Sequence, residues 1–204
     1  MLRTALALAG VLAAVASAAA AAAPRVQVMV VGRSQLLLAP RTVTARAVVV
    51  RASKKRCTAG AATPLAALAA TSLSLRIRDY GGSCSRRAAD GGALFVTQIG
   101  PDRNRGRSGW TYKVGTRAGS AGAADPSGPF GHGRLGADAR ITWFWCRLGS
   151  TETCQRTLAV SSRSRVARGA QLKVRVRGYD DFGHAKRIAG ALVSFGSAQA
   201  ITGP

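Results

Sequence analysis

Few side chains in this sequence have both the type and the spacing that catalysis requires. His132 lies in a glycine-rich stretch, with Asp125 and Ser127 close by in the sequence. A general base needs a neighbour that orients it, and such a trio arises easily in any loop rich in Ser and Asp. Asp180 and Asp181 supply too few oxygens for a hard cation, which takes about six ligands or more. The sequence therefore predicts a protein that is not an enzyme and that holds no metal or cofactor.

The N-terminus has the regions of a secretory signal peptide. Residues 1–3 are short and basic, residues 5–15 are apolar and uncharged, and residues 16–23 are small. An uncleaved membrane anchor is the alternative, but the apolar run is too short for a secure span. We expect residues 1–23 to be removed, leaving no membrane span. The protein is then secreted or extracellular, with cell-wall association as a further expectation.

Four cysteines remain after this segment: Cys57, Cys84, Cys146 and Cys154. An even number in an exported chain favours two disulfides over a zinc site, because no Cys-x-x-Cys pair is present. Four cysteines allow three pairings. A Cys57–Cys84 bridge would fasten a predicted helix to its neighbouring loop, and a Cys146–Cys154 bridge would close a short turn.

The net charge is strongly positive. Lys and Arg number 30 against 8 Asp and Glu, a balance of +22. Such a charge favours anionic partners, whether polymer, nucleic acid or membrane surface. A genome rich in GC codons produces the same abundance of Arg, Ala and Gly, and the sequence favours the two explanations equally. The basic cluster at residues 51–56 can grip phosphates, but its position after a predicted strand is also typical of a solvated turn.

The middle of the chain holds all three tryptophans. Trp110 and Tyr112 alternate with polar residues, and this period indicates a strand with one buried face. Trp143 and Trp145 flank Phe144 in a second strand, which we expect to be covered on both sides. Core packing is favoured for Trp110 and Trp143. Adjacent strand residues point to opposite faces, so one of Phe144 and Trp145 is expected at the surface.

A long crossing of Gly, Ala, Ser and Pro at residues 118–136 joins these two strands. Loops of this length are uncommon in compact domains and often carry function. The candidate ligand-binding residues are therefore Trp110, Tyr112, His132 and Trp145. A stacking platform for single-stranded nucleic acid is an alternative use of aromatic side chains surrounded by arginines.

The other segments predict strands around a single short helix. Thr63 can cap a first helical turn, and Pro64 suits the first helical position. Strands are expected at residues 26–31, 36–38, 42–50, 73–77, 94–99 and 155–160. We expect the last of these to form a hairpin with the second tryptophan strand. One helix packed across a mixed sheet is a β-grasp-like α+β architecture.

The tryptophan motif resembles a known family. Residues 109–115, Gly-Trp-Thr-Tyr-Lys-Val-Gly, and residues 141–143, Ile-Thr-Trp, are similar to motifs of the transcobalamin-like C-terminal domains found in exported bacterial proteins. The Asn that this family carries after the Val is missing here, and Asp138-Ala139 stands in place of Gly-Asp. The resemblance covers residues 42–160. It implies a β-grasp domain, placed at residues 24–160, and the capture of a ligand.

After residue 160 the sequence changes in character. Residues 171–177 and 190–196 have the pattern of strands and are similar to the start of bacterial Ig-like or carboxypeptidase-regulatory-like β-sandwich modules. Such sandwiches need about 100 residues, and residues 161–204 are far fewer. We therefore expect residues 161–204 to form an incomplete Ig-like module, whose open edges pair with another copy or stay poorly ordered.

Together these features predict an exported, non-enzymatic module of the bacterial envelope that serves in adhesion or in binding an envelope polymer or small ligand. The alternative is an electrostatic binder of anionic polymers, such as envelope polyphosphate polymers or nucleic acid. The two hypotheses differ in salt dependence, because binding to phosphates releases counterions and weakens steeply as salt rises. An accessory subunit of a cell-wall hydrolase would need an acid–base pair that the sequence does not contain.

Overall fold

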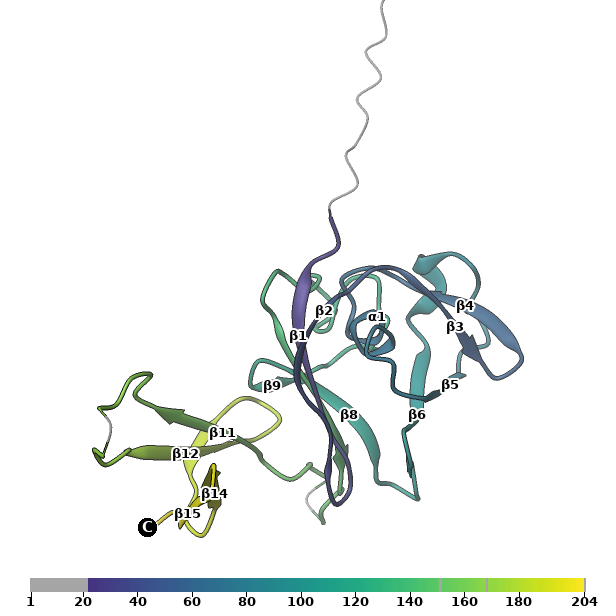
Figure 1. Ribbon diagram of the computed structural model, residues 1–204. Coiled ribbons are helices and arrows are strands. Elements are labelled where there is room, and N and C mark those ends of the chain that lie inside the picture. The colour runs from purple at the N-terminus through teal and green to yellow at the C-terminus, as the bar shows by residue number, and fades with distance from the viewer. Residues whose placement is uncertain (1–21, 151, 168, 204) are drawn as a thin grey trace, which may run out of the picture.

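The computed structural model describes residues 22–150, 152–167 and 169–203. All but the last two residues of the predicted signal peptide lie outside this part of the chain. The described residues are mostly β-sheet with one short α-helix, which places the protein in the mixed α+β class. Figure 1 shows two sheets with the helix between them, and a separate group of C-terminal strands to the left.

The first sheet contains five strands in the order β2-β1-β10-β8-β9. Their bounds are β1 Arg25–Val31, β2 Leu36–Thr44, β8 Gly109–Val114, β9 Arg117–Ala118 and β10 Arg140–Cys146. At the centre β1 and β10 run parallel, and β2 and β8 pair antiparallel on either side of them. Both predicted tryptophan strands are confirmed, and they are neighbours in this sheet.

The second sheet also contains five strands, in the order β4-β3-β5-β6-β7. Their bounds are β3 Val48–Ala52, β4 Lys55–Ala59, β5 Leu75–Asp79, β6 Leu94–Ile99 and β7 Asp102–Arg103. The strand predicted at residues 94–99 is confirmed at both ends. Between β5 and β6 lies the 3-10 helix η1, Ala88–Gly91.

The single strand predicted at residues 42–50 is wrong. β2 of the first sheet ends at Thr44, and the chain then crosses to the second sheet, where β3 begins at Val48. Ala45 is buried at this crossover, where its N–H donates to Pro24 O (2.9 Å) and its carbonyl accepts from Ala62 N (2.8 Å). The apolar alternation continues on both sides of the crossover, so the pattern alone does not reveal the break.

The predicted helix is confirmed as α1, Pro64–Ala69. Thr63 caps it, with its hydroxyl accepting from Ala66 N at 3.3 Å. Leu65 and Leu68 are fully buried and belong to the same core as the tryptophans. Because α1 lies between the two sheets (Figure 1), it is covered from both sides. A helix in this position needs apolar residues around its circumference and not only along one stripe.

Both predicted disulfides are present, Cys57–Cys84 and Cys146–Cys154. The first joins β4 to the loop that follows β5. The second closes the turn that leads out of β10. The described residues contain no free cysteine.

The remaining strands form a three-stranded and a two-stranded sheet. Their bounds are β11 Thr157–Ser162, β12 Val174–Tyr179, β13 Ala185–Arg187, β14 Leu192–Phe195 and β15 Ala198–Ile201. The predicted hairpin between residues 155–160 and the tryptophan strand is wrong, because β11 pairs with β12. The two edges of β10 are already occupied by β1 and β8. β11 spans the boundary that we expected after residue 160.

Candidate functional site

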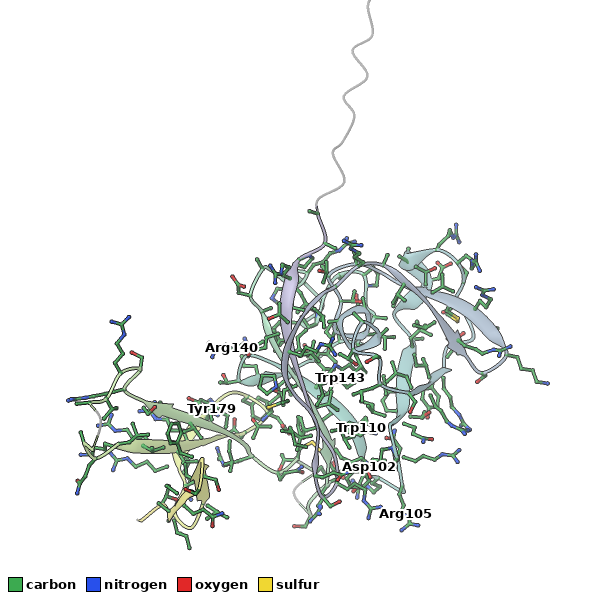
Figure 2. All side chains as sticks on the ribbon, in the orientation of Figure 1. Asp102, Arg105, Trp110, Arg140, Trp143 and Tyr179 are labelled. Atoms are coloured by element: carbon green, nitrogen blue, oxygen red, sulfur yellow. A yellow bond between two sulfur atoms is a disulfide. The ribbon has the colours of Figure 1, made fainter. Side chains whose placement is uncertain are left out.

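The aromatic residues predicted to bind a ligand are part of the core. Trp110, Tyr112 and Trp145 are all buried, as is Trp143, and Figure 2 shows Trp110 and Trp143 in the interior of the two-sheet body. Core packing of Trp110 and Trp143 is therefore confirmed. The indole N–H of Trp110 donates to Asp102 O at 2.7 Å, which ties the first sheet to β7 of the second.

The expectation that Phe144 or Trp145 is exposed is wrong, since only 2% and 6% of these residues is accessible. Each lies under a cation. The Arg33 guanidinium stands 5.0 Å from the centre of the Trp145 ring, and the Lys113 ammonium stands 5.6 Å from that of Phe144. Phe144 and Trp145 point to opposite faces of β10, and both are covered, as the apolar pattern of this segment predicts.

Tyr112 fastens the glycine-rich crossing to the sheet. Its hydroxyl donates to Ala121 O at 2.7 Å, and Pro129 O lies 3.2 Å away. Burial raises the pKa of Tyr112, and the negative charge of Asp125 adds to this, so the hydroxyl stays protonated and remains a donor. The role that the contacts give Tyr112 is structural.

His132 lies in the same crossing but is exposed, with its ring beside that of Phe130 at 6.5 Å between centroids. Asp125 accepts from the backbone N–H of Ser127 at 2.8 Å, which is a local turn contact. The structure thus brings Tyr112 and the crossing together. It does not assemble Trp110, Tyr112, His132 and Trp145 into one exposed surface.

A different set of side chains does gather at the surface, on the face of the second sheet that points away from the core. We name it the arginine face. It consists of five exposed residues from four strands: Arg51, Arg56, Arg76, Arg78 and Arg103. Strand alternation explains their position, because the residues between them, such as Val50, Cys57 and Ile77, point into the core.

The pairing of the strands places these arginines next to one another. Arg51 and Arg56 lie directly opposite each other on β3 and β4. Arg76 and Arg103 both neighbour Gln98 of β6 from opposite sides. Four of the five arginines border a depression of about 340 Å³.

The arginine face has no compensating acid. Within the described part of the chain, none of its five guanidinium groups forms an ion pair with a carboxylate. Asp79 of β5 is on the core side, where 5% of its side chain is accessible and its carboxylate lies 3.6 Å from the ammonium of Lys55. Like charges directly across a strand pair are destabilising. A bound anion removes that repulsion at Arg51 and Arg56, so the face is electrostatically suited to anions.

Two aromatic rings stand beside the arginines. Phe95 of β6 lies opposite Arg78 of β5 and is 40% exposed. Its ring meets the edge of Tyr80, which is 68% exposed, at 5.4 Å between centroids. Exposed rings among arginines are the arrangement on which the bases of a single strand stack.

The arginine face as a whole could not be predicted from the sequence. The alternation of Arg76 and Arg78 with apolar residues predicts that both point outward, and the cluster at residues 51–56 was already a candidate for phosphate contact. That these two segments share one face follows only from the β3–β5 contact, at Ala52 and Ile77. No feature of the sequence around Phe95 or Arg103 indicates that these residues lie on this face.

No protein-family model, curated protein or solved structure matches the chain. Across the described residues there is no helix long and apolar enough to cross a membrane. The same residues contain no group of three or more His, Cys, Asp or Glu side chains that could hold a metal ion. Function is therefore inferred from the arginine face itself.

Proposed function

We propose that this chain is an exported, non-enzymatic binding protein of the bacterial envelope, which holds anionic polymers on its arginine face. The observation that carries the proposal is the like-charged pair Arg51 and Arg56, part of a face of five arginines without a carboxylate partner in the described chain. Codon bias explains an abundance of arginine. It does not explain why these arginines share one sheet face from which acids are missing.

The polymer class follows from the chemistry of the guanidinium group. Its planar fork of donors matches the oxygens of a phosphate and binds them in pairs. Neighbouring strands lie about 4.8 Å apart, so the face offers several such forks to successive phosphates of one chain. Envelope polyphosphate polymers and nucleic acid share this chemistry, and only nucleic acid has bases that can stack on Phe95 and Tyr80.

Export and the finer fold classes are part of the same proposal. Two disulfides are compatible with an extracellular or secreted protein. The parallel pair β1–β10, flanked by β2 and β8 and packed on α1, supports the β-grasp-like, transcobalamin-like architecture for the first unit. The small sheets of β11–β15 support an incomplete Ig-like module for the second.

The test compares two variants with the same loss of charge. Arg56→Gln/Arg76→Gln/Arg78→Gln removes three residues of the arginine face. Arg25→Gln/Arg41→Gln/Arg46→Gln removes three exposed arginines from the other part of the body. Binding of labelled polyphosphate and of a single-stranded oligonucleotide is measured by fluorescence anisotropy across a salt series.

We expect the wild type to bind both polymers with an affinity that falls steeply with salt. The arginine-face variant should lose about tenfold or more in affinity, and the slope of log K against log salt should become shallower by about 2 to 3. The control variant should lose much less. Equal losses in the two variants would show that net charge alone drives binding, and no binding at low salt would refute the proposal.

A further inference from the structure

A second recess, distinct from the arginine face, lies between the first sheet and the C-terminal strands. We name it the cleft. Its volume is about 500 Å³, within the usual range for small-molecule sites. One wall is the face of β1 and β10 that points away from the core, and the other comes from β11 and the end of β12. Figure 2 shows Arg140 and Tyr179 on the side of the body where these walls meet.

The parallel pairing of β1 with β10 arranges the first wall in rows. In order along the strands, the rows are Gln27 with Arg140, Met29 with Thr142, and Val31 with Phe144. At about 3.3 Å per residue, the first and last rows are about 13 Å apart. Arg140 and Gln27 make one end of the wall cationic and hydrogen-bonding. Val31 makes the other end apolar, beside Phe144, which lies under Lys113. The two ends are separated by the length of a small chain molecule.

The cation at the polar end is free to meet a ligand. Two arginines border the cleft, Arg140 and Arg156. The Arg156 guanidinium already has partners within the protein. It donates to Gly178 O (3.2 Å) and His184 O (2.9 Å) and lies 3.5 Å from the Asp180 carboxylate. The Arg140 side chain is exposed and has no hydrogen-bond or ion-pair partner among the described residues.

The opposite wall is held in place by a buried lysine. The ammonium of Lys113, a residue with no accessible surface, donates to Tyr179 O and Asp180 O, both at 2.8 Å. It also donates to Thr157 Oγ1 at 3.2 Å. These bonds fix the start of β11 and the end of β12 against β8, so the distance between the two walls of the cleft is defined.

The second wall offers apolar surface that nothing in the described chain covers. Leu158 of β11 lines the cleft, yet it is 54% exposed. Across from it stand Met29 and Val31, both partly exposed. An unbranched, polarisable Met side chain adapts to the shape of a flexible apolar partner. An apolar chain placed between these walls would bury surface on both.

We propose that the cleft binds a small amphipathic carboxylate, a molecule like a fatty acid. Its carboxylate pairs with the Arg140 guanidinium at the solvated end, and its hydrocarbon chain runs along Met29 and Val31 under Leu158. The charged group stays near water, where the cost of desolvation is small. The hydrocarbon chain gains stability from the burial of apolar surface on both walls.

The test is isothermal titration calorimetry of the purified protein with decanoate and with decanol, which lacks the charge. Arg140→Gln should weaken decanoate binding about tenfold and leave decanol binding unchanged, because only the carboxylate needs the guanidinium. Arg46→Gln, which removes an equal charge from an exposed position outside the cleft, should change neither. Leu158→Glu should abolish binding of both ligands.

Three outcomes would overturn the proposal. They are no binding of decanoate to the wild type, equal effects of Arg140→Gln and Arg46→Gln, and decanoate binding that survives Leu158→Glu. The altered side chains of Arg140 and Leu158 are both exposed, so the variants should fold, and circular dichroism checks this. Should either fail to fold, the other still decides, because the two act on opposite walls.

Discussion

At the scale of single residues, Lys113 has the environment that departs furthest from the ordinary. Lysine is almost never fully buried unless it is paired, and here the ammonium is surrounded by carbonyls with the Asp181 carboxylate at 3.6 Å. Burial lowers the pKa of Lys113 from its ordinary value of 10.5, and Asp181 opposes this in part. The residue joins β8 to the C-terminal strands.

This environment predicts a pH dependence of stability. Because the pKa of Lys113 is lower in the folded state, the unfolded chain binds more protons between the lowered value and 10.5. In that window the contribution of Lys113 to the free energy of unfolding rises with pH. Lys113→Met removes this dependence and leaves two carbonyls without a donor.

We therefore expect Lys113→Met to be less stable than the wild type by about 1 to 3 kcal/mol at about pH 9. The difference should widen as the pH rises through the interval between the lowered pKa of Lys113 and 10.5. Urea unfolding of both proteins over this range measures it. A difference that narrows with rising pH would contradict the assignment.

At the scale of elements, α1 depends on its N-terminal cap. Thr63 is fully buried, and its hydroxyl accepts from Ala66 N (3.3 Å) while donating to Gly60 O (2.7 Å). The cap therefore holds both the first turn and the loop that enters the helix. A helix of this length has little stability of its own, so its position between the sheets relies on such contacts.

Thr63→Ala should lower the free energy of unfolding by about 1 to 2 kcal/mol, since it removes the cap and leaves buried groups without a partner. Thr63→Ser keeps the hydroxyl and should retain most of the stability. Thermal unfolding followed by circular dichroism compares the three proteins. Equal loss in the Ser and Ala variants would assign the effect to the lost methyl group instead of the cap.

At the scale of the whole molecule, the two proposed binding regions belong to different sheets. The arginine face is the outer side of the second sheet, and the cleft lies on the outer side of the first, with α1 and the core between them (Figure 1). At physiological salt, charges are screened over about 8 Å. The two regions should therefore bind their ligands independently.

Independent binding is tested by titrating decanoate into the protein with and without saturating polyphosphate at about 150 mM salt. The dissociation constant for decanoate should change by no more than about twofold, because screening separates the charges. Strong competition would mean that polyphosphate occupies Arg140, and that the two regions are one site.

Local features of the sequence were sufficient for much of the secondary structure. The strand at residues 94–99, the helix after Thr63 and both disulfides are confirmed. The strand and the helix are set by alternation and capping within a few residues, and a cysteine pair close in sequence closes easily. The family resemblance, the export of the chain and the identity of its ligands stay predictions.

Tertiary structure alone decided which strands are neighbours. Alternation says which side chains share a face, but it says nothing about the strand beside them. It therefore missed the crossover at Ala45, the pairing of β11 with β12, and the meeting of Arg51 with Arg76 and Arg78 across separate strands. The cation over Phe144 likewise comes from Lys113, whose ammonium is held by carbonyls more than sixty residues further along the chain. Which strands pair with one another depends on the packing of the whole chain, and a local sequence pattern does not determine it.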